Sequence, residues 1–230
     1  MDKLKTKMKT TEKTMKTPET KCLIRSREME SGRKISTLIA ASTVIRRAVL
    51  IVLAALMLGT VAPAAELAGV TLPDTFGAGE QTLKLNGLGL RKKAMFKVYV
   101  GGLYLETPSK DAVEILAADK AKAICMHYLR SLTKDQLVEG FQEGFEGNAK
   151  DKAGQKAAFN QMLALIPDMK EGDTLTFIYL PGKGTTLKAG DKDLGTFQGK
   201  DFADAVFSIW LGPKPPTEDL QKGMLGLTHS

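Results

Sequence analysis

Cysteine and histidine are almost missing from this chain, which has two of each in 230 residues. Cys22 lies in the N-terminal segment, so a chain that loses this segment keeps only Cys125 and cannot form an intramolecular disulfide. A metal site needs three or four ligands, and Cys125 and His127 form only a pair. On one strand their side chains would lie roughly 6–7 Å apart, too far for a nucleophile–base hydrogen bond. We therefore expect no metal, no cofactor and no Cys–His catalytic site.

Excess positive charge is absent from most of the chain. The whole sequence has 33 Lys and Arg against 26 Asp and Glu, but residues 1–65 contain 13 of the bases and 5 of the acids. The remainder, residues 66–230, has 33 − 13 = 20 bases and 26 − 5 = 21 acids, a net charge of −1. A nucleic-acid-binding domain normally carries a basic patch or stripe, so we expect no nucleic-acid partner.

The chain also lacks an apolar run as long as a typical membrane span of roughly 20 residues. Its longest run, about 15 residues, follows Arg46-Arg47 and precedes the small-x-small pair Ala62 and Ala64. This order predicts a basic leader and secretion signal peptide over residues 1–65, cleaved near Ala64; a permanent anchor is the alternative. Residues 66–230 would then form a periplasmic or secreted domain, in contact with a membrane only through an uncleaved leader.

Hydrophobic periodicity predicts how the domain begins. Two antiparallel strands are expected at Gln81–Arg91 and Met95–Leu105, joined by a short turn, and Ser109 is expected to cap a short helix. A third strand is predicted over Lys122–Arg130.

The second half is predicted to contain helices on both sides of a β-meander. Thr133 and Gln136 have capping-box spacing, and apolar residues then repeat at helical spacing. The expected later elements are a helix ending before Pro167, strands around residues 173–180, 186–188 and 194–197, a helix over residues 202–210, and a short helix from Thr217. This pattern predicts an α+β fold with an antiparallel sheet and helices packed on one side.

One face of the first strand suggests a binding site. Leu83, Leu85, Gly87, Gly89 and Arg91 share one parity and are therefore expected on one face. Two glycines beside an arginine would leave a gap in the side-chain layer with a positive charge at its edge. Such a gap suits an amphiphilic acid whose tail fills it and whose carboxylate pairs with the guanidinium. The alternative is that Arg91 ends the strand in solvent and the glycines only relieve twist.

Two segments, Leu85–Glu106 and Phe202–Pro215, resemble the chalcone isomerase-like family, particularly its exported bacterial branch. The resemblance implies an open-faced β-sandwich, in which a large antiparallel sheet is covered by a layer of helices. In the plant isomerases, an arginine after the Gly-x-Gly segment stabilises a developing enolate, and Arg91 matches that position. Tyr99 stands where those enzymes have a threonine, and Ile209 stands at the specificity hydroxyl position, with Ser208 one residue away.

These departures favour binding over catalysis. An arginine with a tyrosine resembles the carboxylate-binding pair of the family's non-catalytic fatty-acid-binding members, which implies that Arg91 and Tyr99 hold a headgroup and Ile209 contacts the ligand. The preferred hypothesis is therefore a non-catalytic periplasmic binding protein for a fatty acid or similar amphiphilic carboxylate.

Several alternatives stay open at this stage. The chain could instead be an isomerase for an aromatic substrate, with Arg91 and Tyr99 catalytic, or an interaction protein with a collapsed pocket. Tyr99 could equally be an ordinary sheet aromatic. The aromatic residues of the helices could line the cleft or build the core; they are Phe141, Phe145, Phe159 and Trp210.

Overall fold

The structure is a computed structural model that describes residues 64–228. Residues 1–63 of the predicted leader, which include the apolar core of its signal, lie outside these residues. The strands are β1 (Ala64–Leu67), β2 (Val70–Pro73), β3 (Thr75–Ala78), β4 (Gln81–Lys93), β5 (Phe96–Leu105), β6 (Lys122–Tyr128), β7 (Thr174–Leu180), β8 (Gly184–Ala189) and β9 (Lys192–Phe197). The helices are α2 (Ala112–Ala117), α3 (Lys134–Asn148), α4 (Lys152–Leu165), α5 (Lys200–Leu211) and α6 (Glu218–Met224). Within this part of the chain, no helix has the length and apolar character to cross a membrane.

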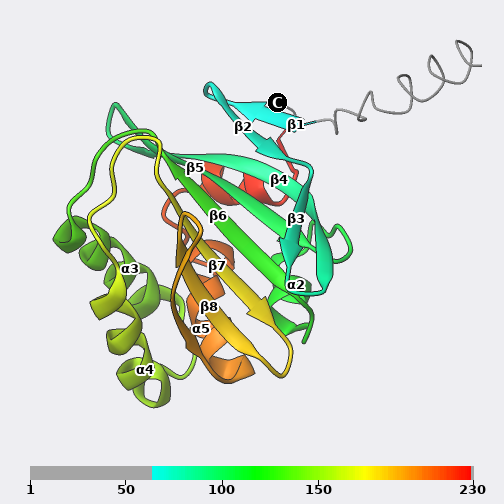
Figure 1. The fold of residues 1–230 in the computed structure, drawn as a ribbon, viewed down its shortest axis with the longest axis vertical. Helices are drawn as coiled ribbons and strands as arrows, with labels where there is room; N and C mark the ends of the chain where they lie inside the picture. Colours follow the sequence, from blue (N-terminus) through cyan, green and yellow to red (C-terminus); the bar gives the residue numbers. More distant parts are fainter. Residues whose placement is uncertain (1–63, 229–230) are drawn as a thin grey trace, which may run out of the picture. The chain divides into compact units, whose positions relative to one another are not determined.

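Strands β3 to β9 form one sheet in sequence order, and every neighbouring pair is antiparallel. Its inner face packs against the helices and holds the main apolar core, which includes Leu103, Ile124 and Phe177. The β1–β2 hairpin packs on the outer face, where Val70 and Leu72 contact Val100. In Figure 1, α5 and α6 lie behind the sheet and this hairpin lies in front. The arrangement confirms the predicted α+β fold, a large antiparallel sheet covered by a layer of helices.

Helix starts follow the local capping chemistry, with one correction. Thr133 and Gln136 form the predicted capping box, because each side chain bonds the other residue's backbone N–H. The cap of α2, however, is Asp111 and not Ser109: the Asp111 carboxylate accepts from the backbone N–H groups of Val113 and Glu114. A carboxylate also has the favourable charge for a helix N-terminus, which explains why Asp111 rather than Ser109 caps α2.

A β-bulge at Asn86 changes which residues of β4 face the helices. Leu85 pairs with Tyr104 and Gly87 pairs with Leu103, so Asn86 is an extra residue in β4. Leu83 and Leu85 therefore face the outer side, whereas Gly87, Gly89 and Arg91 face the helices. The prediction that all five alternate residues share one face was wrong, because strand parity is interrupted by the bulge.

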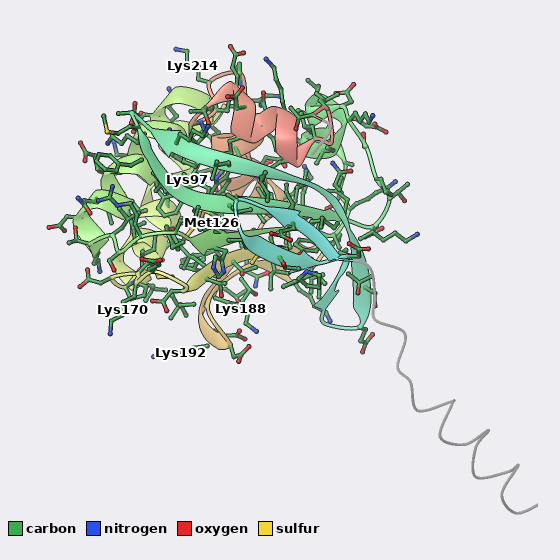
Figure 2. All side chains as sticks on the ribbon, turned by 90° about the horizontal axis from the view of Figure 1, so that it is seen from above. Lys97, Met126, Lys170, Lys188, Lys192 and Lys214 are labelled. Carbon is green, nitrogen blue, oxygen red and sulfur yellow. The ribbon has the colours of Figure 1, made fainter. Side chains whose placement is uncertain are left out.

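Helix α6 fills the gap that the glycines leave in the side-chain layer. A Cβ atom at Gly89 would lie closer than 3.0 Å to the Leu220 carbonyl group, and one at Gly87 equally close to the Gly223 carbonyl oxygen. Figure 2 shows α6 and the β1–β2 hairpin on opposite sides of the sheet. The predicted use of this gap for a ligand tail is therefore wrong: the glycines allow the backbone of α6 to approach the strand.

We predict that Gly89→Ala lowers the free energy of unfolding by about 2 kcal/mol or more, because the added methyl group must push α6 off the sheet. Urea unfolding of the full chain measures this loss. Gly77→Ala on β3 is the control, because a Cβ atom there meets nothing within 4 Å. Equal stability of the two variants would contradict the close packing of α6 on β4.

Candidate functional site

A cavity of about 570 Å³ lies between the inner face of the sheet and helices α3 and α5. Strands β4, β5 and β6 provide one wall, the two helices provide the other, and the segment after α5 closes part of the rim. The lining residues are Arg91, Lys93, Phe96, Val98, Tyr99, Met126, Tyr128, Arg130, Leu132, Gln136, Leu137, Glu139, Gly140, Phe141, Glu143, Gly144, Gly147, Ile209, Trp210, Lys214, Pro215 and Pro216. The three residues predicted to contact a ligand, Arg91, Tyr99 and Ile209, thus line the same cavity.

Arg91 is a half-buried cation in the cavity wall. It is directly opposite Tyr99 across the β4–β5 ladder, so the two side chains leave the sheet on the same face. Its guanidinium group donates one hydrogen bond to the neighbouring carbonyl of Lys92. Within residues 64–228, no ion pair involves Arg91. A guanidinium has five N–H donors, so Arg91 keeps donors for an anion in the cavity.

Tyr99 is held in place by the only tryptophan of the sequence. The Trp210 indole N–H donates to the Tyr99 hydroxyl oxygen over 3.0 Å, and both side chains are buried. Burial raises the pKa of Tyr99 to about 12, although the Trp210 hydrogen bond and the charge of Arg91 act in the opposite direction. Tyr99 is therefore neutral near pH 7. Because its oxygen already accepts from Trp210, its hydroxyl hydrogen can be donated into the cavity.

The rest of the cavity wall is mainly apolar and aromatic. The Phe141 and Trp210 rings meet edge to face at 5.9 Å, and the Tyr99 and Tyr128 rings do so at 5.8 Å. Phe145 and Phe159, in contrast, stack on each other at 4.1 Å in the core and do not line the cavity. The aromatic residues of the helices are thus divided between the two roles that the sequence left open.

Helix α5 presents Ile209 to the cavity and keeps the neighbouring hydroxyl out of it. Ile209 packs on α3 where Gly144 leaves room, since a Cβ atom there would lie 2.5 Å from the Ile209 Cγ2 atom. The Ser208 hydroxyl is buried and donates to the Ala205 carbonyl oxygen over 2.8 Å. The cavity therefore has the apolar side chain of Ile209 in its wall and not the hydroxyl of Ser208.

Sequence reasoning missed several groups of this site. The sequence indicates Trp210 only as a core or cleft aromatic and does not identify it as the hydrogen-bond donor to Tyr99. The glycines of α3 that line the cavity, Gly140, Gly144 and Gly147, could not be recognised as site residues from the sequence, because glycine occurs in helices for many reasons. Charged residues at the cavity rim could have been found only from the tertiary contacts; they are Lys93, Arg130, Glu139, Glu143 and Lys214.

Cys125 and His127 lie on the other side of the sheet from the cavity. Cys125 packs with Tyr104 and Ala123 in the outer cluster, and burial raises the pKa of its thiol. In the part of the chain that the structure describes, no group of three or more His, Cys, Asp and Glu side chains could hold a metal ion.

Comparison with known proteins gives one family and a structural relative. A family model described as chalcone isomerase-like matches residues 64–226. A fatty-acid binding protein of Arabidopsis thaliana has a similar structure, with a TM-score of 0.58, 17% sequence identity, and coverage of 71% of this chain and 96% of that one. No curated protein matches the sequence.

We predict that Tyr99→Phe leaves the Trp210 indole N–H without its acceptor and lowers the free energy of unfolding by about 1–3 kcal/mol. Because Trp210 is the only tryptophan, its fluorescence emission should change in the same variant. Tyr104→Phe is the control: it removes a hydroxyl bonded to the Pro73 carbonyl on the outer face and should leave the emission unchanged. An unchanged emission in Tyr99→Phe would contradict the hydrogen bond.

Proposed function

This chain belongs to the chalcone isomerase-like family, and we propose that it is a non-catalytic binding protein for a fatty acid or a similar amphiphilic carboxylate. The observation that carries the proposal is the pairing of Arg91 with Tyr99 in the wall of an otherwise largely apolar cavity. Arg91 is a cation without an ion-pair partner among residues 64–228, and Tyr99 is a neutral hydroxyl donor beside it.

A carboxylate headgroup matches this pair of donors. Arg91 would provide charge-assisted hydrogen bonds to the two carboxylate oxygens, and Tyr99 would add the hydrogen that Trp210 leaves available. Partial burial strengthens these bonds, because water competes less well for the donors than it does at a free surface.

The remaining cavity suits an alkyl chain. Its volume of about 570 Å³ lies within the range of roughly 300–1,000 Å³ that is typical of small-molecule sites. Met126, Leu137, Phe141 and Ile209 supply apolar walls that would cover the chain. The similar plant structure is a fatty-acid binding protein, which supports this ligand class for the fold.

The proposed location is the periplasm or the extracellular space, after cleavage near Ala64. The order of basic flank, apolar run and small residues in the leader supports export. The family match begins at residue 64, which supports a domain boundary near the proposed cleavage site.

An isomerase remains the second candidate, because Arg91 matches the arginine that stabilises an enolate in the plant enzymes. Its other requirements are poorly met. Tyr99, with a pKa of about 12, is a weak proton relay near neutral pH. The Ser208 hydroxyl is bonded to the Ala205 carbonyl and does not line the cavity. The binding role is therefore favoured.

We predict that Arg91→Ala weakens palmitate binding about 10- to 100-fold, which corresponds to the loss of charge-assisted hydrogen bonds. Titration followed by Trp210 fluorescence measures the affinity, because Trp210 lines the cavity. Lys97→Ala is the matched control, since it removes a cation of β5 that does not line the cavity. Palmitate methyl ester should bind wild type and Arg91→Ala with similar affinity.

Two results would contradict the binding role. Equal palmitate affinity in wild type and Arg91→Ala would remove Arg91 from the headgroup site. Cyclisation of a hydroxychalcone by the wild type, lost in Arg91→Ala, would favour the isomerase.

We also predict that Gly140→Leu lowers the affinity for long-chain fatty acids at least fivefold, with a smaller effect on short-chain ones. Gly140 lines the cavity, and a Cβ atom there meets nothing within 4 Å, so the added side chain narrows the cavity without a backbone clash. The free energy of unfolding should not fall, since glycine in a helix costs about 1 kcal/mol relative to better helix formers. Gly140→Ala is the control, and equal effects of both substitutions on affinity would contradict a chain-length-dependent site.

A further inference from the structure

The tip of the β4–β5 hairpin, residues Lys92–Lys97, combines exposed apolar side chains with positive charge. Met95 is 86% exposed and Phe96 is 54% exposed, although both are large hydrophobic residues. Three lysines lie in the same six residues: Lys92, Lys93 and Lys97. Ala94, with φ 54°, makes the turn that presents Met95 to solvent.

The hairpin tip adjoins the mouth of the cavity. Lys93 and Phe96 line the cavity, and the Arg130 guanidinium, which also lines it, lies 4.8 Å from the centre of the Phe96 ring. None of the basic residues of this region forms an ion pair with a side chain of residues 64–228. Three lysines thus lie in the exposed apolar tip, and two further cations, Arg91 and Arg130, line the adjoining cavity.

This cluster stands out against the charge of the domain. Residues 66–230 carry 20 bases and 21 acids, so the domain as a whole has no excess of positive charge. The hairpin tip therefore differs from the rest of the domain in its charge. Glu139 and Glu143 lie across the cavity on α3. A local cationic surface attracts an anionic partner, and exposed apolar side chains at its tip favour insertion into the boundary between headgroups and acyl chains.

We propose that the hairpin tip docks on a bilayer containing anionic phospholipid, so that the cavity mouth faces the membrane and the ligand passes between bilayer and cavity. This inference rests on the proposed binding of a fatty acid. The leader was the only membrane contact expected from the sequence, and the hairpin tip adds a second one in the domain itself. A bilayer fits better than a protein partner, because the apolar tip adjoins the opening that an acyl chain would use.

The experiment compares two triple variants of the full chain. Lys92→Glu/Met95→Ser/Lys97→Glu changes the hairpin tip at residues that do not line the cavity. Lys110→Glu/Val113→Ser/Lys183→Glu makes the same types of change at the other end of the strands, where Val113 is 76% exposed. Both variants keep the same leader, so the leader contributes equally to them.

Co-sedimentation with phosphatidylcholine vesicles, with and without phosphatidylglycerol, measures docking. We expect the hairpin-tip variant to bind the anionic vesicles about 10-fold or more weakly than wild type, and the control variant to bind like wild type. Soluble palmitate affinity should be unchanged in both. Equal vesicle binding by all three proteins would overturn the proposal and leave a protein as the partner of the hairpin tip. A loss in the hairpin-tip variant without any preference for anionic lipid would overturn the role of the lysines, because it would show apolar insertion alone. If vesicle docking fails while palmitate binds, the proposed function stands without this inference. If palmitate does not bind, the proposed function itself fails.

Discussion

The extra residue at Asn86 is the constraint on which the site depends. Without this bulge, the parity set by Leu83 and Leu85 would place Gly87, Gly89 and Arg91 on the outer face of the sheet. Both polar groups of the Asn86 side-chain amide are hydrogen-bonded. The amide N–H donates to the Met224 carbonyl oxygen, and the amide oxygen accepts from the Ser109 backbone N–H, both over 2.9 Å. The same bulge thus positions α6 against the glycines and turns Arg91 toward the cavity.

The polar groups of the cavity are few and each has a defined environment. The Tyr99 hydroxyl is neutral near pH 7 and burial raises its pKa further, to about 12, while the hydrogen bond from Trp210 fixes its orientation. The guanidinium group of Arg91 is a cation whose planar set of donors matches a carboxylate. A permanent cation beside a fixed neutral donor suits the recognition of an anion more than a cycle of proton transfers. The proposed binding role is supported by these two side chains and by the Ser208 hydroxyl, which is bonded to the Ala205 carbonyl and does not line the cavity.

Periodicity and capping predicted most of this fold, because those signals are local. The strands of the first hairpin, the capping box at Thr133 and the helix end before Pro167 are all present in the structure. The bulge at Asn86 was missed, since one extra residue in a strand leaves no periodic signature, and the glycine gap was consequently assigned to a ligand instead of α6. Arg91 was named from the strand pattern as well as from a family resemblance, and Tyr99 and Ile209 from the resemblance alone. Their meeting at one cavity depends on contacts between β4, β5 and α5 that no local pattern contains.

The most direct test of the account is to identify what the protein carries when it is isolated from its host without added lipid. The protein would be denatured and the released small molecules quantified by mass spectrometry, with a mock purification as the blank. The account predicts an alkyl carboxylate in an amount comparable to that of the protein, because the cavity offers one cationic headgroup site and apolar walls. Release of only neutral lipids or flavonoid-like molecules would contradict it.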